Sequence, residues 1–175
     1  MRQKNFPENH PDVATSYVNM AAVYEGMGDY LKALSFYKKA LEIQQKTLPE
    51  NHPSLATSYG NMAGVYYHMG EYSKALSFHE KALEMREKTL LPNHPSVATS
   101  YNNIAGVYKN LGEYSKALFF FEKALEIFEK TLPSNHPDLA TSYNNIAGVY
   151  YNMGQYLKAL SFFENALEIS EKTLP

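Results

Sequence analysis

Residues 93–132 read NHPSVATSYNNIAGVYKNLGEYSKALFFFEKALEIFEKTL, and this stretch decides the fold because it recurs along the chain. The Asn-His-Pro triplet that opens it occurs four times, each time 42 residues after the last, at residues 9–11, 51–53, 93–95 and 135–137. A fixed period of this order is typical of proteins built from stacked supersecondary units. The spacing therefore predicts one repeat domain over residues 1–175, made of four units, 7–48, 49–90, 91–132 and 133–174.

Each unit is predicted to form two helices. Pro95 suits the first turn of a helix, because the N–H that proline lacks has no helical partner there. The first helix (helix A) should run to about Leu111, where Gly112 can adopt the left-handed conformation that ends many helices. The second (helix B) should run over about Tyr114–Thr131, before the next proline. No segment alternates with a period of two, so no strand is predicted.

Both helices carry an apolar face. In the third unit, helix A repeats apolar residues every three or four positions, at Ala98, Tyr101, Ile104, Ala105, Tyr108 and Leu111. Helix B does the same at Tyr114, Ala117, Leu118, Phe121, Ala124, Leu125 and Phe128. A single helix pair cannot bury both faces, whereas stacked neighbours bury them in a continuous core. The pattern therefore predicts an all-α solenoid, with Glu-to-Lys pairs such as Glu84–Lys88, Glu126–Lys130 and Glu168–Lys172 on the solvent side of helix B.

The composition argues against several function classes. The formal net charge is −2, which gives no general reason to expect a nucleic-acid-binding face. The absence of cysteine excludes disulfides and thiolate metal sites. No apolar run approaches the roughly 20 residues of a membrane span, and residues 1–6 lack the apolar core of a signal peptide. We therefore expect a cytoplasmic protein that binds neither nucleic acid nor membranes.

The histidines and the serines do not form a catalytic or metal-binding pattern. Serine, histidine and aspartate repeat with the unit, whereas nucleophilic catalysis needs one unique arrangement of nucleophile and base. Stacked helices would place the recurring histidines about 8–10 Å apart, but a metal–His bond is about 2 Å. A structural role at the start of helix A is expected for these four, His10, His52, His94 and His136. No enzymatic activity, cofactor or metal is therefore expected.

His79 is a separate case, because it stands where the other units have Tyr37, Phe121 and Phe163. An aromatic residue at the same position in every other unit indicates a packing position. We therefore interpret His79 as a histidine of the core or its boundary.

The third unit resembles the tetratricopeptide repeat, whose signature reads Trp-x2-Leu-Gly-x2-Tyr and then Ala-x3-Phe. Here Tyr101-x2-Ile104-Ala105-x2-Tyr108 is followed by Ala117-x3-Phe121, with Tyr for Trp and Ala for the packing Gly. The usual period of that repeat is about 34 residues, and a longer one would also fit HEAT or armadillo repeats of about 40–47. The signature residues favour the tetratricopeptide reading. The longer unit, with its His-Pro-Asp-x-Ala-Thr-Ser-Tyr-x-Asn sequence, resembles the 42-residue variant of kinesin light chains and nephrocystin-like proteins.

This resemblance implies a right-handed superhelix of four helix pairs, in which helices A line a concave side that holds extended peptides. A second stripe of helix A maps onto that side, and we call it the groove stripe. Its predicted peptide-binding members are Asn19, Asn61, Asn103, Asn145, Asn102, Asn144, Tyr67, Lys109, Tyr151, His68, Asn110 and Asn152. The first four form an asparagine ladder, and an amide side chain can both donate to and accept from a peptide main chain. The alternative is that each asparagine bonds only the neighbouring helix or water.

The units differ mainly along this same stripe. The varying positions read Val18, Gly60, Asn102 and Asn144, then Glu25, Tyr67, Lys109 and Tyr151, then Gly26, His68, Asn110 and Asn152. A uniform frame with varied groove positions is what a peptide-binding protein needs, although drift at exposed sites would give the same pattern. Lys109 is the one clear cation, so neither a carboxylate clamp of several cations nor a strongly acidic peptide is expected.

Glycine recurs next to the ladder at Gly64, Gly106 and Gly148. A glycine inside a helix costs roughly 0.5–1 kcal/mol relative to alanine, so something should compensate for it. Either a ligand backbone approaches there, or another helix packs tightly. Tight helix packing is the favoured prediction, since it needs no partner.

The sequence thus predicts a protein–protein interaction scaffold that binds extended peptides on helices A. The alternative function is structural: a spacer, or a fragment that assembles end to end with no groove ligand. Residues 1–6 align with the end of a helix B and are interpreted as the remnant of a preceding unit. We therefore expect a fragment of a longer array, with head-to-tail self-association through uncapped end repeats.

Overall fold

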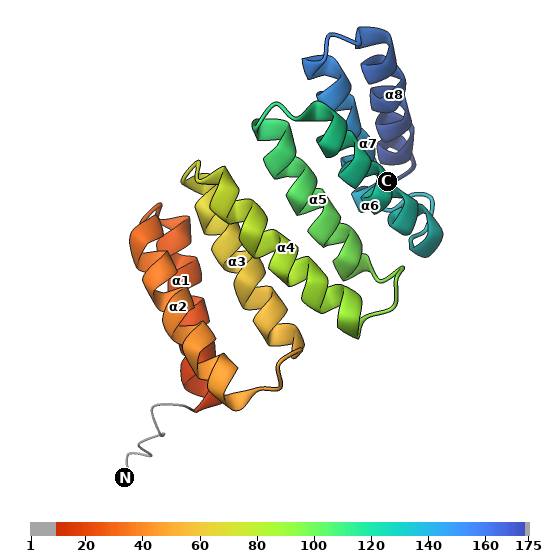
Figure 1. Cartoon of the computed structure of the whole chain (residues 1–175). Coiled ribbons are helices and arrows are strands. Elements are labelled where there is room, and N and C mark those ends of the chain that lie inside the picture. The colour runs from red at the N-terminus through yellow and green to blue at the C-terminus, as the bar shows by residue number, and fades with distance from the viewer. Residues whose placement is uncertain (1–9, 174–175) are drawn as a thin grey trace. The chain divides into compact units, whose positions relative to one another are not determined.

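Eight α-helices make up the computed structural model, which describes residues 10–173 and contains no strand within that range (Figure 1). The odd-numbered helices are the predicted helices A, and the even-numbered ones are the predicted helices B. Their bounds are α1 Pro11–Gly26, α2 Tyr30–Thr47, α3 Pro53–His68, α4 Tyr72–Thr89, α5 Pro95–Asn110, α6 Tyr114–Thr131, α7 Pro137–Asn152 and α8 Tyr156–Thr173. The predicted bounds of the third unit are confirmed to within one residue. The interpretation of residues 1–6 lies outside the described residues.

A histidine caps the start of every helix A. In each case the side-chain Nδ1 accepts the backbone N–H two residues further on, at 3.1 to 3.2 Å, in His10, His52, His94 and His136. The proline that follows lacks an N–H, so the cap serves the next donor along the helix. The structural role predicted for these histidines is confirmed.

Replacing His52 by alanine should lower the free energy of unfolding by about 0.5–2 kcal/mol, the usual cost of losing an N-cap acceptor. The bond lost is the one from the Ser54 N–H to His52 Nδ1, at 3.2 Å. Urea unfolding followed by circular dichroism measures the change. His52→Asn supplies another good N-cap acceptor and should recover most of the loss. If the asparagine variant is no more stable than the alanine variant, the histidine acts through packing and not through the cap.

A three-residue turn joins each helix A to its helix B. In the third unit Gly112 has a φ of 75°, in the left-handed region that favours glycine. The N–H of Glu113 then donates to the carbonyl of Tyr108 at 2.9 Å, which closes the end of α5. The sequence signal at Gly112 therefore predicted the turn correctly, and this turn makes the two helices of a unit antiparallel neighbours.

The described helices fall into two compact groups, α1–α4 and α5–α8, which divide between Thr89 and Leu90. We call these groups the first and the second unit, and each of their two helix pairs a repeat. In the first, α2 packs against α3, and in the second, α6 packs against α7. The division falls one residue before a predicted repeat boundary. The single domain over residues 1–175 stays a prediction.

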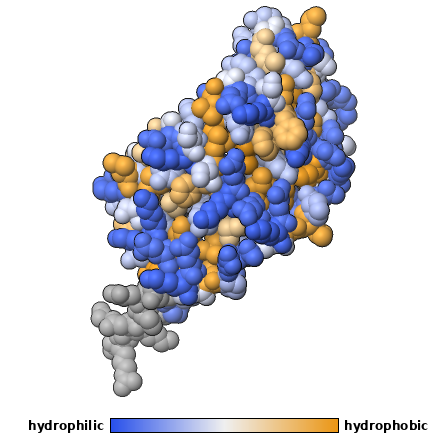
Figure 2. Space-filling view, viewed as in Figure 1, coloured by the Kyte–Doolittle hydropathy of each residue, from blue (hydrophilic) through white to orange (hydrophobic). Residues whose placement is uncertain are grey.

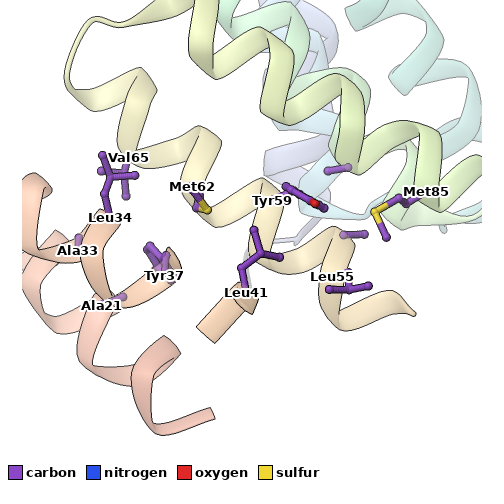
Figure 3. Close-up of a cluster of buried hydrophobic side chains, with 12 residues drawn as sticks. Ala21, Ala33, Leu34, Tyr37, Leu41, Leu55, Tyr59, Met62, Val65 and Met85 are labelled. Carbon is purple, nitrogen blue, oxygen red and sulfur yellow. The ribbon is translucent and has the colours of Figure 1, made fainter. Parts of the chain in front are cut away.

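Small residues let the paired helices approach, and large ones fill the remaining space. Ala21 and Ala33 are fully buried where α1 meets α2, and Met62 and Val65 pack in the same cluster from α3 (Figure 3). The whole cluster of the first unit comprises Ala21, Ala33, Leu34, Tyr37, Leu41, Leu55, Ala56, Tyr59, Met62, Val65, Ala82 and Met85. The equivalents of Ala21 and Ala33 in the third repeat, Ala105 and Ala117, are also fully buried. The core follows most of the predicted apolar faces, but in the third repeat Leu111 is 41% exposed and Val107, which was not predicted, is fully buried.

Lysines of helix B cover the aromatic face of helix A, which the sequence analysis did not anticipate. In the first repeat Phe36 lies between Tyr17 and Tyr24, with ring centroids 5.9 and 5.4 Å away. Lys39 Nζ lies 5.7 Å from the Tyr17 ring and Lys32 Nζ lies 5.2 Å from the Tyr24 ring. Such cation–π contacts contribute about 0.5–1 kcal/mol at exposed sites. The frequent tyrosines are thereby used in packing.

Hydrogen bonds from helix B to the next helix A set the register of neighbouring repeats. In the first unit Gln45 Nε2 donates to the Tyr59 hydroxyl at 3.0 Å. In the second unit the Tyr143 hydroxyl donates to Glu129 Oε1 at 2.7 Å. Burial and this carboxylate raise the pKa of Tyr143 to about 12. The same pair of positions therefore joins neighbouring repeats in both units.

The outer side of helix B is charged. The predicted Glu-to-Lys pairs four residues apart are confirmed at 2.5 to 2.6 Å, in Glu84–Lys88, Glu126–Lys130 and Glu168–Lys172. In Figure 2 hydrophilic and hydrophobic residues are interspersed over the visible face. None of the described helices is both long and apolar enough to span a membrane.

Candidate functional site

The groove stripe is accessible to solvent along all four helices A. Its exposed members are Asn19, His68, Asn103, Asn110, Asn144, Tyr151 and Asn152. Its half-buried members are Asn61, Tyr67, Asn102, Lys109 and Asn145. None of the predicted site residues is buried, so the stripe meets the condition on which the binding hypothesis depends. Their role in binding stays a prediction.

The asparagine ladder has unused hydrogen-bonding capacity. None of its four members forms a side-chain hydrogen bond within its own unit of the described chain. In the first unit Asn61 lines a cavity of about 280 Å³ between α1 and α3. Thr15 and Val18 of α1 and Thr57 and Ser58 of α3 line the same cavity. Within each unit the asparagines therefore form no side-chain hydrogen bond to a neighbouring helix, and the alternative in which they bond water is not tested.

A hydrogen-bonded pair of polar side chains contributes to the lining of this cavity. Ser58 is buried, and its hydroxyl donates to Gln44 Oε1 at 2.6 Å. In the second unit Phe128 stands where Gln44 stands, and the hydroxyl of Ser142 donates instead to the Asp138 carbonyl at 2.9 Å. The two units therefore carry different side chains, an amide and a phenyl ring, at equivalent positions near the asparagine ladder.

Asn102 contains a buried acceptor without a partner. Its Oδ1 is inaccessible to solvent and accepts no hydrogen bond from any described residue. Val18 stands at the equivalent position of the first repeat and packs against the core cluster. A buried acceptor left unsatisfied costs about 1–3 kcal/mol, so an amide at this apolar position requires an explanation.

The mid-helix glycines do not mark tight helix packing, and that prediction is wrong. A Cβ at Gly64 would meet only Glu25 Oε1, at 3.8 Å, and one at Gly148 would meet only the end of the Lys109 side chain, with Nζ at 3.2 Å. No backbone of another helix in the same unit lies within 4 Å of either position. The space beside Gly64 and Gly148 is instead occupied by a groove-stripe side chain of the preceding helix A, and a Cβ at Gly106 would meet no described atom within 4 Å.

Glu25 is the centre of a polar cluster in the first unit. The Tyr37 hydroxyl donates to Glu25 Oε2 at 3.0 Å, and His68 Nε2 lies 4.0 Å from Glu25 Oε1. Burial and the adjacent carboxylate raise the pKa of Tyr37 far above its ordinary value, so this hydroxyl stays a donor. Sequence reasoning named Glu25 only as a varying position. It did not identify Tyr37 of α2 as a partner of Glu25, because the two residues lie on different helices and only the fold brings them together.

An aromatic row adjoins this carboxylate. The ring of His68 stacks on Tyr30, with centroids 5.9 Å apart and an interplanar angle of 12°. Tyr67 contacts His68 at 5.6 Å and Tyr72 at 5.9 Å, both edge to face. Two of these residues, Tyr67 and His68, were predicted groove residues, and the structure brings them together with the starts of α2 and α4.

The second unit has a cation at the position of Glu25. Lys109 is half-buried and forms no ion pair with a described residue of its unit. Its side chain extends toward α7, where Gly148 leaves room for the ammonium group. Tyr151 and Tyr156 keep the edge-to-face contact of the first unit, at 5.4 Å, but Phe121 and Asn152 replace Tyr37 and His68.

Comparison with known proteins agrees with this architecture. Family models described as tetratricopeptide repeat match residues 12–88, 54–130 and 139–175. No curated protein sequence matches the chain significantly.

Several solved structures share the fold. Nearly identical TPR-like repeats of a Podosopora anserina protein assigned as a kinesin light chain are 31% identical, with a TM-score of 0.81, covering 95% of this chain and 79% of that one. BtubC (BKLC) from P. vanneervenii is 29% identical, with a TM-score of 0.83, over 94% of this chain and 65% of that one. The apo form of RapI is 26% identical, with a TM-score of 0.82, over 97% of this chain and 59% of that one. This chain thus spans less than two thirds of the last two proteins. The matches confirm the predicted all-α solenoid of four helix pairs.

Proposed function

Because the chain belongs to the tetratricopeptide repeat family, with repeats of the kinesin light chain type, we propose that its groove stripe binds extended peptide segments of partner proteins. Arrays of this kind are protein–protein interaction scaffolds, and their stacked repeats provide extended concave binding surfaces. Tetratricopeptide repeat domains generally act as scaffolds and not as enzymes. On such a scaffold the groove stripe would be the surface that binds the partner, and the bound segment would be extended.

One observation carries the proposal. The same amide recurs in every repeat, at Asn19, Asn61, Asn103 and Asn145, and has no hydrogen-bonding partner within its unit. A peptide main chain offers one N–H and one carbonyl per residue, and an asparagine side chain can satisfy both kinds of group. A row of such amides can hold a main chain without regard to its side chains. Selectivity then comes from the varying positions beside the ladder.

Replacing Asn61 and Asn103 together by alanine should weaken peptide binding about tenfold or more, since each lost hydrogen bond costs about 0.5–1.5 kcal/mol. The probe is a displayed library of random 12-residue peptides, from which the best binders are synthesised and titrated by fluorescence anisotropy. Asn165→Ala removes an exposed amide from α8 and serves as the matched control. Unchanged affinity in the double variant, with helicity intact, would rule out the ladder.

Replacing Asn102 by valine, the residue type of the first repeat, should raise the free energy of unfolding by about 1–3 kcal/mol, because it removes the unsatisfied acceptor. The same change should weaken binding of the selected peptides if the amide is there for a ligand. Urea unfolding and anisotropy measure the two effects on one protein sample. A variant that is more stable and binds as well as the wild type would show that Asn102 has no part in binding.

A second candidate function rests on α8. This helix exposes several large apolar side chains, Leu157, Leu160, Phe163 and Leu167. A face of this kind can receive another copy of the chain, and head-to-tail contacts that do not close form open filaments. Sedimentation at millimolar concentration tests this alternative. A strict monomer there would count against it, and Leu157→Lys should abolish any association that is seen.

A further inference from the structure

Glu25 in α1 and Lys109 in α5 occupy the same position of helix A, two repeats apart, and carry opposite charges. The intervening and following equivalents, Tyr67 and Tyr151, are uncharged. We propose that the first unit binds a basic side chain at Glu25 and the second unit binds an acidic side chain at Lys109. Each unit then selects its own class of segment, the first one with a basic residue and the second one with an acidic residue. This inference rests on the proposed function and names the class of peptide that the groove selects.

The surroundings of Glu25 suit a cation. Its carboxylate is held in place by the Tyr37 hydroxyl at 3.0 Å, yet its side chain keeps 26% of its accessible surface. The row formed by Tyr30, His68 and Tyr67 lies beside it, with successive ring centroids 5.9 and 5.6 Å apart. A guanidinium group can pair with a carboxylate and stack on aromatic rings at the same time. An arginine side chain therefore fits this subsite better than a lysine.

The surroundings of Lys109 suit a single carboxylate. The ammonium group is half-buried and has no acidic partner among the described residues of its unit. A charge that is partly removed from water without a partner is unfavourable, so an incoming carboxylate would relieve that cost. Amides of the same unit, including Asn103 and Asn145, lie in the same stripe and can hold the adjoining main chain.

Gly148 gives the second subsite its shape. A Cβ at this position would lie 3.2 Å from Lys109 Nζ and 3.9 Å from Cε, so the ammonium group would have to move slightly to admit it. At the equivalent Gly64, the nearest atom to an added Cβ is Glu25 Oε1 at 3.8 Å, an ordinary contact distance. A side chain at Gly148 therefore shifts the ammonium group by a few tenths of an ångström, whereas one at Gly64 makes only an ordinary contact with the carboxylate.

The test is a selection from a displayed library of random 12-residue peptides, carried out on the wild-type chain and on the two charge-reversed variants Glu25→Lys and Lys109→Glu. Peptides selected by the wild type should fall into two groups, one enriched in a basic residue and one enriched in an acidic residue. Glu25→Lys should lose the first group, and Lys109→Glu should lose the second. Each selected peptide should bind the variant that is reversed at its own subsite at least tenfold more weakly than it binds the wild type.

Three further variants keep the result interpretable if a charge-reversed protein folds poorly. Glu25→Gln can still accept from Tyr37 and should lose only the preference for a basic residue. Gly148→Ala should weaken binding of the acidic residue several-fold, whereas Gly64→Ala is its steric control and should leave that preference unchanged. Thermal unfolding by circular dichroism verifies that each variant is folded.

The outcomes separate this inference from the function on which it rests. If the wild type enriches no peptides above a bare support, the groove does not bind peptide and both proposals fail. If it enriches peptides whose charges do not change with Glu25 and Lys109, peptide binding stands and the charge assignment is overturned.

Discussion

Lowering the pH from 7 to 4 should destabilise the wild-type chain by about 3 kcal/mol more than a His79→Phe variant. His79 is only 6% exposed, and its burial, followed by the nearby positive charge of Arg86, lowers its pKa from 6.5 to about 4. A shift of one pKa unit corresponds to about 1.4 kcal/mol, which gives the size of the effect. Phenylalanine is the residue at the equivalent position 121, so the substitution restores the pattern of the third repeat.

The direction of this effect follows from the proton balance. Between pH 6.5 and about 4 the unfolded chain binds a proton at His79, whereas the folded chain keeps the neutral imidazole. The stability contributed by the neutral form is therefore complete above pH 6.5 and is lost as the pH falls toward 4. Carboxylates titrate in the lower part of this window in both proteins, so only the difference between the two is informative.

Urea midpoints at several pH values measure the difference. His68→Asn is the control, because this histidine is exposed and asparagine is found at the equivalent position 152. The control variant should keep the steep pH dependence of the wild type. If the wild type and His79→Phe lose stability in parallel between pH 7 and 4, the buried imidazole is not the source.

Met62→Ala should lower the free energy of unfolding by about 2–5 kcal/mol, whereas Met20→Ala should lower it by less than about 1 kcal/mol. The two methionines occupy the same position of helix A in successive repeats. Met62 is 2% exposed within the core cluster of the first unit, and Met20 is 42% exposed. The cost of truncation depends on the contacts and the cavity left behind, and only the second methionine has a complete set of neighbours.

Chemical denaturation of both variants tests this contrast within one protein. Because the side chains are identical, differences in transfer free energy between residue types cancel. Equal losses in the two variants would contradict the stacking of helix A on the preceding helix B. Met62→Leu should recover most of the loss, since it nearly conserves volume.

The helices could be predicted closely because the signals for them are local and are repeated. A proline and a glycine bound helix A in each repeat, and Gly112 adopts the left-handed conformation that its place in the sequence predicts. The apolar period fixes the buried faces, and Ala105 and Ala117, which it places on them, are fully buried. Four copies of one pattern also reveal which positions vary, which a single copy does not.

The candidate site could be predicted only as a list of positions. The contact between Glu25 and Tyr37 joins two helices through side-chain conformations, and no spacing in the sequence reports it. The room that Gly148 leaves for Lys109 depends in the same way on how two helices A lie within a unit. Sequence periodicity therefore identifies the face on which such groups lie, whereas the partners of each group require coordinates.

The hydrogen bonds that link one repeat to the next have a consequence for refolding. Gln45 with Tyr59, and Glu129 with Tyr143, are the same pair of positions in two near-copies of one interface. A helix B released during unfolding therefore meets several helices A of almost equal affinity, in its own molecule and in others. Repeat proteins characteristically misassemble in this way. Refolding of this chain should therefore be slowed by mispaired intermediates displaced by whole repeats, and the yield of monomer should fall as protein concentration rises.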